Sequence, residues 1–218
     1  MRAWSATPPA RVIIWLKAGV FGLALLPLAR LAAKGYLQTL GANPIEFITR
    51  STGTWTLALL LVTLAITPLR RWTGFAWLIR LRRMLGLFAF FYGCLHFTTY
   101  FWLDQFFDWA AIAKDIVKRP FITMGFLAFC LMLPLAATST QGMMRRLGGK
   151  RWQTLHRLVY VCGVAGVVHY WWLVKRDITQ PLIYGSVLVF LLGARLARPS
   201  RQTPKQSART VIRQPSRS

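Results

Sequence analysis

Three histidines are the residues best suited to chemistry in this sequence of 218 residues. His96 lies in one long apolar stretch, and His156 and His169 lie together in another. An ionisable side chain inside a stretch of membrane-spanning length is costly without a partner, so it predicts a functional site. For any single histidine the alternative is a hydrogen bond to a neighbouring helix. Because neutral imidazole is a common ligand of haem iron, the three histidines point first to redox chemistry.

The elements that position these histidines are predicted to be transmembrane helices. Hydrophobic residues make up 55% of the chain and gather into blocks about as long as a bilayer is thick. The sequence therefore predicts an all-α membrane protein, a bundle of about six transmembrane helices. These helices are expected near residues 12–32, 52–69, 83–103, 120–138, 152–173 and 179–197. Residues 1–198 would form one membrane domain, followed by a basic, disordered cytoplasmic tail at 199–218.

Charged residues predict the orientation of the helices. Lysine and arginine, which give a net charge of +23, cluster in the second and fourth connections and in the tail. The five acidic residues lie in the first, third and fifth connections: Glu46, Asp104, Asp108, Asp115 and Asp177. Because basic loops are retained on the cytoplasmic side, the N and C termini are both predicted to be cytoplasmic. Membrane topology and contacts with membrane lipids explain the charge, so no nucleic acid partner is expected.

His96 and His169 are predicted to form a pair in the outer half of the membrane. His96 follows Arg83 by 13 residues and His169 follows Arg151 by 18. At 1.5 Å per residue these separations are about 20 and 27 Å along two parallel helices. Two imidazoles at similar depth predict the axial ligands of one haem b, one on each face of the iron. Such a haem has no open position for oxygen chemistry, so it transfers electrons.

His156 lies closer to the predicted cytoplasmic side. It is separated from His169 by 13 residues, which is not a whole number of turns, so an ideal helix would point the two apart. A second haem there would need a partner about four turns before His96, and that position is Arg82. A guanidinium is a poor iron ligand, but it pairs well with a propionate or phosphate. Ligation of an inner haem, contact with a flavin or quinone, and a structural hydrogen bond remain open for His156.

Aromatic and cysteine side chains give weaker signals. Five tryptophans near predicted helix ends are typical of interfacial anchors: Trp102, Trp109, Trp152, Trp171 and Trp172. Four phenylalanines near His96 suit a haem pocket, the core or lipid equally: Phe88, Phe90, Phe91 and Phe97. The three cysteines show no paired spacing, so they are interpreted as small buried hydrophobic residues.

Several segments resemble the MsrQ (formerly YedZ) family, the haem-binding membrane subunits of bacterial periplasmic methionine sulfoxide reductase systems. They are residues 82–87, 92–100, 118–120, 133–139, 151–160 and 169–175. The resemblance extends to about Arg198 and includes the order of the three histidines. The family belongs to the ferric reductase-like transmembrane superfamily. The resemblance implies a multi-pass protein of the bacterial cell inner membrane with haem b and, as a further cofactor, FMN.

The resemblance also implies a direction of electron flow. Electrons would come from the quinone pool or a cytoplasmic flavin reductase and reach a periplasmic molybdenum-cofactor reductase. That catalytic subunit would repair oxidised methionines in periplasmic proteins. Superfamily members with two haems carry two histidines on each of two helices, whereas Arg82 stands at one of those positions here. The chain would be an electron-transfer subunit rather than a complete enzyme.

Two other functions remain as alternatives. A stand-alone transmembrane metalloreductase would deliver electrons to external metal, but the sequence has no glycine-rich dinucleotide fingerprint for oxidising NADPH directly. A small histidine-lined transporter would typically show inverted repeats, and none is present in the sequence. The pair formed by His96 and His169 favours electron transfer over both.

Overall fold

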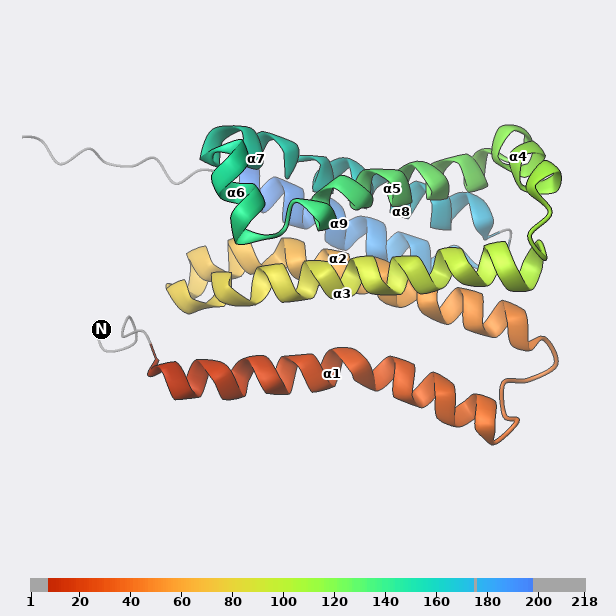
Figure 1. Ribbon diagram of the computed structural model, residues 1–218, viewed down its shortest axis with the longest axis horizontal. Helices are drawn as coiled ribbons and strands as arrows, with labels where there is room; N and C mark the ends of the chain where they lie inside the picture. Colours follow the sequence, from red (N-terminus) through yellow and green to blue (C-terminus); the bar gives the residue numbers. More distant parts are fainter. Residues whose placement is uncertain (1–7, 175, 198–218) are drawn as a thin grey trace, which may run out of the picture.

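The computed structural model describes residues 8–174 and 176–197, which contain helices and no strand. Six longer helices lie side by side along the long axis of the molecule (Figure 1). They are α1 (Ala10–Tyr36), α2 (Pro44–Thr73), α3 (Ile79–Thr98), α5 (Pro120–Ala137), α8 (Leu158–Leu173) and α9 (Thr179–Leu196). The predicted all-α bundle is confirmed, whereas the predicted tail at 199–218 lies outside the described residues.

Shorter elements connect these helices. They are the 3-10 helix η1 (Ala76–Leu78), the π-helix η2 (Thr99–Asp104), α4 (Trp109–Lys118), α6 (Gln141–Leu147) and α7 (Gly149–Leu155). The sequence analysis treated 104–119 as a plain connection, but α4 forms there because Asp108 caps it by accepting a 2.9 Å hydrogen bond from the amide of Ala111. A search for apolar blocks misses such short polar helices.

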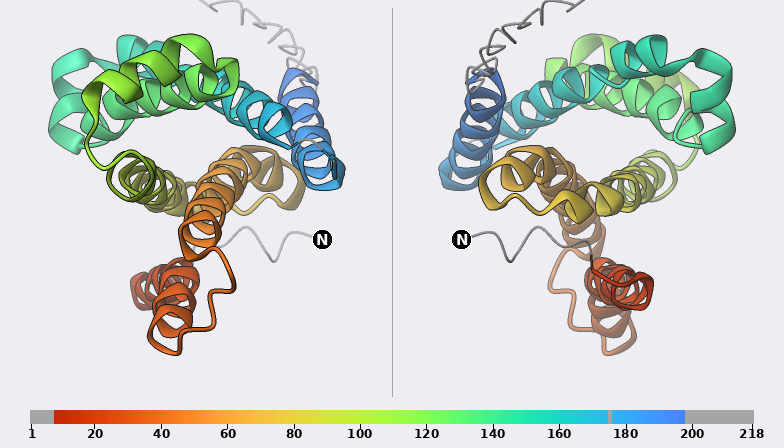
Figure 2. Two further views of the ribbon diagram at one scale, coloured as in Figure 1. Left: turned by 90° about the vertical axis from the view of Figure 1, so that its right-hand side faces the viewer. Right: turned by 90° about the vertical axis from the view of Figure 1, so that its left-hand side faces the viewer.

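Five helices are long and apolar enough to cross a membrane: α1, α2, α3 with its flanking η1 and η2, α5 and α9. The sixth predicted span, 152–173, is wrong as one continuous helix. A turn at His156 and Arg157 divides it into α7 and α8. With 16 residues, α8 is about 24 Å long, and it packs along α5 in one layer of the bundle (Figure 2).

Helix ends extend beyond the apolar blocks where polar residues cap them. The prediction began a helix at residue 52, whereas α2 begins at Pro44, whose missing N–H suits a first turn. Asn43 caps α2 by accepting a 3.2 Å hydrogen bond from the amide of Glu46. Pro120 occupies the first turn of α5, as predicted.

The two ends of the bundle differ in charge. One end, on the right of Figure 1, is built from the loop between α1 and α2, from η2 with α4, and from the turn before α9. It carries all five acidic residues of the sequence and is called the acidic end below. The other end is built from η1, α6, α7 and the last turn of α9. It carries the arginine clusters at 70–71, 80–83 and 145–146 and is called the basic end.

Two helix pairs form the bundle. The α2 and α3 helices pack closely together, as do α5 and α8, and α9 lies against α2 and α8. Side chains between these helices are almost fully buried, including Leu64, Ala89 and Cys162. Cys162 is therefore the small buried residue that was predicted, whereas Cys94 and Cys130 are half-buried.

The α1 helix lies at the edge of the bundle and is held by Tyr92 of α3. The Tyr92 hydroxyl donates to the carbonyl of Ala24 at 2.8 Å and accepts from the amide of Leu28 at 3.1 Å. A residue of another helix thus replaces the Leu28 to Ala24 hydrogen bond of α1, directly after Pro27. Proline and an inserted side chain both bend helices, and α1 is curved in Figure 1.

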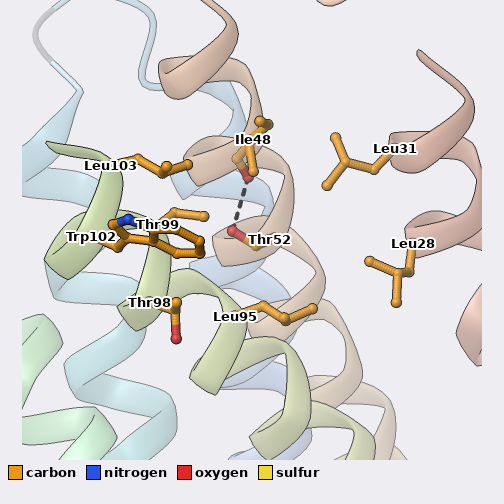
Figure 3. A pocket seen from close by; sticks show the side chains of 9 residues that line it. All are labelled: Leu28, Leu31, Ile48, Thr52, Leu95, Thr98, Thr99, Trp102 and Leu103. Atoms are coloured by element: carbon orange, nitrogen blue, oxygen red, sulfur yellow. Dashed lines mark hydrogen bonds between the residues drawn. The ribbon is translucent and has the colours of Figure 1, made fainter. Parts of the chain in front are cut away.

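Beyond Tyr92, α1 diverges from its neighbours toward the acidic end. An apolar groove of about 200 Å³ opens there between α1, α2 and α3 (Figure 3). Leu28 and Leu31 face it from α1, and Leu95 faces it from α3. The Thr52 hydroxyl on its wall donates at 2.9 Å to the carbonyl of Ile48 in its own helix, so the groove presents an almost wholly apolar surface.

Candidate functional site

The structure brings His96 and His169 together near the acidic end. His96 lies in the last turn of α3, and His169 lies about one turn before the end of α8. Their ring centroids are 6.1 Å apart, and the ring planes meet at 73°. Two residues separated by 73 positions in the sequence therefore present their imidazoles to one another across the two helix pairs.

Each of these imidazoles is fixed by a backbone carbonyl of the other helix in its own pair. The Nδ1 atom of His96 lies 2.9 Å from the carbonyl oxygen of Thr49 in α2. The Nδ1 atom of His169 lies 2.6 Å from the carbonyl oxygen of Phe121 in α5. A carbonyl only accepts, so Nδ1 carries the proton in both neutral rings. The lone pair of each ring is then on Nε2, as a metal-ligating histidine requires.

Two glycines make room for the rings. A Cβ atom added at Gly53 of α2 would lie 2.9 Å from Cε1 of His96. A Cβ atom added at Gly125 of α5 would lie 2.8 Å from Nδ1 of His169. Both distances are shorter than carbon atoms tolerate, so any larger residue would displace an imidazole from its carbonyl partner. The α2 and α5 helices thus leave space for the two imidazole rings because Gly53 and Gly125 have no side chain.

The donor set fits a haem. Two metal–imidazole bonds of about 2 Å and the half-widths of the two rings add up to a centroid separation of roughly 6 Å, close to the observed spacing. Among the described residues, no group of three or more His, Cys, Asp or Glu side chains could hold a bare metal ion. An iron porphyrin needs only two protein ligands, because the macrocycle supplies the other four.

Aromatic rings line α3 and α5 beside this pair. Phe97 of α3 stacks on Phe129 of α5 with centroids 4.7 Å apart, and Phe90 stacks on the same ring at 6.1 Å. Phe88 instead packs against Phe21 of α1 at 5.1 Å and contacts Phe91. The four phenylalanines named from the sequence therefore divide between the interface with α5 and the interface with α1.

His156 lies apart from the pair, in the turn between α7 and α8. Its Nδ1 atom is 3.1 Å from the carbonyl oxygen of Trp152, and the two rings stack with centroids 3.9 Å apart. The Trp152 indole donates to the carbonyl of Thr138 at 2.9 Å. Trp152 therefore fixes His156, beyond the anchoring role predicted for it. The Nε2 atom of His156 is buried and has no hydrogen-bond partner among the described residues.

Arg82 lies near the start of α3, at the basic end. It is half-buried, and its charge is close enough to interact with His156, Tyr160 and Arg195. The Arg195 guanidinium donates to the Tyr160 hydroxyl at 2.6 Å and to the carbonyl of Leu64 at 2.5 Å. The basic end thus combines one imidazole nitrogen that has no hydrogen-bond partner among the described residues with two half-buried guanidinium groups.

Sequence reasoning missed several parts of both groups. Gly53 and Gly125 could have been found, because an isolated glycine inside a helical stretch often marks a close approach. Arg195 left no comparable signal, since an arginine in the last turn of a helix usually faces the interface. The carbonyls of Thr49 and Phe121 left none, because every residue has one.

Comparison with known proteins adds an independent finding. Residues 52–167 match a family model described as ferric reductase like transmembrane component. The chain is 57% identical over 210 residues to a Herminiimonas arsenicoxydans protein named protein-methionine-sulfoxide reductase heme-binding subunit MsrQ, covering 95% of each chain. A protein of the same name from Ralstonia nicotianae is 59% identical over 188 residues, covering 85% of this chain and 84% of the relative. A third, from Xanthomonas campestris, is 49% identical over 205 residues, covering 90% and 94%.

Proposed function

Because the chain belongs to the MsrQ family, within the ferric reductase-like transmembrane proteins, we propose that it is a haem b subunit that carries electrons across the bacterial inner membrane. The observation that carries this proposal is the facing pair of imidazoles, 6.1 Å apart, with both Nδ1 atoms held by carbonyls. His96 and His169 would be the axial ligands of the iron. When bound, haem supplies a one-electron carrier with no coordination position open for other chemistry.

The protein's contribution is to position and insulate this carrier. The carbonyls of Thr49 and Phe121 fix the tautomer and orientation of each ring, and hydrogen-bonded imidazole is a stronger ligand than free imidazole. Both imidazoles are half-buried between the helices, where an apolar surrounding favours a tightly held macrocycle. The function follows from rigid placement rather than from a group that exchanges protons with substrate.

The proposed orientation places the acidic end in the periplasm and the basic end, with both termini, in the cytoplasm. Support comes from the arginine clusters beside η1 and in α6, since basic loops stay cytoplasmic. The haem pair would then lie close to the outer surface. A reporter fused within α4 (Trp109–Lys118) should report an outside location, whereas an inside location would reverse the proposed topology.

The proposed electron acceptor is the periplasmic molybdenum-cofactor catalytic subunit of a methionine sulfoxide reductase. The relatives' name supports this partner, because it describes a haem-binding subunit of a protein-methionine-sulfoxide reductase. The proposed donor is the quinone pool or a cytoplasmic flavin reductase, with FMN as a further cofactor. The chain would thus serve a separate enzyme. If it were a stand-alone metalloreductase instead, reduction of external metal would persist after deletion of the partner.

A second haem is proposed at the basic end, with His156 as one ligand. The buried, unpartnered Nε2 atom of His156 supports it, because a buried nitrogen without a partner is costly. Arg82 would contact an acidic group of this cofactor rather than the iron. The ratio of haem to protein tests the proposal, since two haems per chain are expected and a value of one would leave only the outer site.

Absorption spectroscopy tests the main proposal. The purified full chain, expressed with ample haem, should show a reduced b-type spectrum, and His96→Ala and His169→Ala should each remove the outer haem. Arg83→Gln, which changes an exposed residue of α3, is the matched control and should keep the spectrum. A colourless wild-type protein would refute the proposed function. A spectrum unchanged in both alanine variants would refute the ligand assignment.

A further inference from the structure

The Arg195 side chain points into the bundle, away from the basic end where its own backbone lies. The Arg71 guanidinium of α2 donates to the backbone carbonyl of Arg195 at 3.4 Å. The guanidinium of Arg195, however, reaches the carbonyl of Leu64, seven residues earlier in α2. Leu64 lies about two turns before Arg71 in α2, and α2 runs from the acidic end to the basic end, so Leu64 is farther from the basic end than Arg71.

This direction is the opposite of what an unpaired arginine adopts in a membrane helix. A free guanidinium near a helix end extends toward the interface, where water and lipid phosphates solvate it. Arg195 instead occupies interior space beside Leu64, which is fully buried. Its Nε atom is also buried, without a hydrogen-bond partner among the described residues. The Tyr160 ring lies under this charge, with its centroid 5.2 Å from Cζ of Arg195, and stabilises the charge without neutralising it.

No acidic side chain of this sequence lies near the charge of Arg195. Arg82 brings a second guanidinium within electrostatic range of Arg195, so the interior charge at the basic end is at least doubled. All five acidic side chains of the sequence belong to the acidic end. Carbonyl and hydroxyl acceptors satisfy two N–H groups of Arg195, but they carry no full negative charge. Among the described residues, therefore, no acidic side chain supplies the counter-charge.

We propose that Arg195 and Arg82 form a binding site for an anionic group, a carboxylate or a phosphate, of a ligand held inside the bundle at the basic end. Tyr160 belongs to the site. Its hydroxyl accepts from Arg195 at 2.6 Å, which leaves its own hydrogen to donate to the same anion. A guanidinium presents paired donors that match both kinds of oxyanion, and such charge-assisted hydrogen bonds are the strong ones.

The anionic group has three possible sources, which share this chemistry. A carboxylate would be a propionate of haem, next to the unpartnered Nε2 of His156. A phosphate would belong to FMN or to a phospholipid whose headgroup enters between the helices. The choice between a cofactor and a lipid as the source of the anion rests on the proposed function. The need for an anion does not, because the charges of Arg82 and Arg195 require a counter-ion whichever molecule supplies it.

The test compares Arg195→Gln with Arg195→Lys, Tyr160→Phe and the exposed control Arg83→Gln, each purified as the full chain in mild detergent. Three ligands are measured per chain: haem, acid-released FMN and the phosphorus of tightly bound lipid. Gel filtration and the reduced spectrum of the His96–His169 haem show that each variant is folded. Reconstitution with haem dimethyl ester, which lacks propionate charges, is measured on the wild type in parallel.

We expect the affinity of Arg195→Gln for one of the three ligands to fall by more than about tenfold, because an ion pair has lost one partner. Arg195→Lys should restore part of the retention, and Tyr160→Phe should lose less than Arg195→Gln. Loss of one haem, with exclusion of the dimethyl ester, assigns a propionate. Loss of FMN or of lipid phosphorus assigns a phosphate from that source.

Two outcomes would overturn the inference. One is a folded Arg195→Gln protein with wild-type haem, FMN and lipid phosphorus. The other is an equal loss of ligand in Arg83→Gln, which would show an effect of net charge alone. Failure of the proposed function looks different, because the wild-type protein would then contain no haem, while Arg195→Gln could still lose bound phosphate.

Discussion

The two ends of this bundle hold their histidines in different ways. At the acidic end, His96 and His169 are fixed by carbonyls of neighbouring helices, and their rings face one another. At the basic end, His156 is held by Trp152, a residue of its own short helix, and its Nε2 has no partner among the described residues. The first site presents two imidazoles that protein carbonyls orient. The second presents one imidazole with the charge of Arg82 near it.

This difference explains why one end resembles a finished metal site and the other an open one. Tertiary hydrogen bonds orient both imidazoles before any metal arrives, so the acidic end is pre-organised. The turn at His156 depends on local contacts, and Arg82 stands where a second histidine would be needed. Substitutions at one end at a time test whether the two ends differ in this way.

The largest effect is expected from Gly125→Ala at the acidic end. The new Cβ would lie 2.8 Å from Nδ1 of His169, so the ring must leave its carbonyl partner. Haem retention at this pair should fall by about 10- to 100-fold, as when a supporting hydrogen bond of a metal ligand is lost. Haem content and the reduced spectrum measure it.

The matched control for this change is Gly19→Ala in α1, where nothing lies within 4 Å of an added Cβ. It should keep the wild-type haem content. A Gly125→Ala protein with an unchanged spectrum would show that the close packing of His169 against Gly125 is dispensable for haem binding.

The next effect is expected from His156→Ala at the basic end. The variant should lose about half of the haem and keep the spectrum of the His96–His169 site, because the two sites share no ligand. Haem stoichiometry and a redox titration measure the change. Loss of both haems would mean that the ends are not independent, and retention of both would exclude His156 as an iron ligand.

A smaller effect is expected from Tyr92→Phe, which lies between the two ends. The variant loses the hydroxyl that bridges Ala24 and Leu28 of α1. A lost hydrogen bond costs about 1 kcal/mol, which lowers the unfolding temperature by roughly 2–4 °C in a chain of this size. Thermal unfolding in detergent measures it. Tyr36→Phe, at a residue that is 89% exposed, should leave the unfolding temperature unchanged.

The smallest effect is expected from Asn43→Ala, which removes the cap of α2 at the acidic end. Losing this cap should cost about 1 kcal/mol locally and fray the turn that leads toward Thr49, the residue holding His96. Faster amide hydrogen exchange at the start of α2 would reveal it. Thr140→Ala removes the corresponding cap of α6 at the basic end. It should leave exchange near Thr49 unchanged, and equal effects of the two changes would contradict the local argument.

Much of the fold could be predicted because a bilayer imposes a simple rule on sequence. Apolar blocks of membrane length located the long helices, and Pro120 was correctly placed in the first turn of α5. The same rule failed where a helix or a helix end is polar. It missed α4 and the polar first turns of α2, and it joined α7 to α8 across the turn at His156.

The candidate site, too, was predicted in part. The order and depth of His96 and His169 predicted that the two would meet, and the structure places their rings 6.1 Å apart. Their role as haem ligands stays a prediction. The close approach of the imidazoles to Gly53 and Gly125 depends on which helices become neighbours. Helical periodicity in the sequence does not specify those neighbours.

By itself the sequence determined that the chain crosses a membrane, that its acidic side chains gather at one end, and that His96 and His169 lie within apolar helices. These properties follow from residue type and spacing, because the bilayer selects directly for apolar helices of its own thickness and for basic residues on one side. Only the tertiary structure decided that His96 faces His169 and that Arg195 turns inward to Leu64. Those contacts join residues far apart in the chain, and they depend on helix rotation and packing that no single segment encodes.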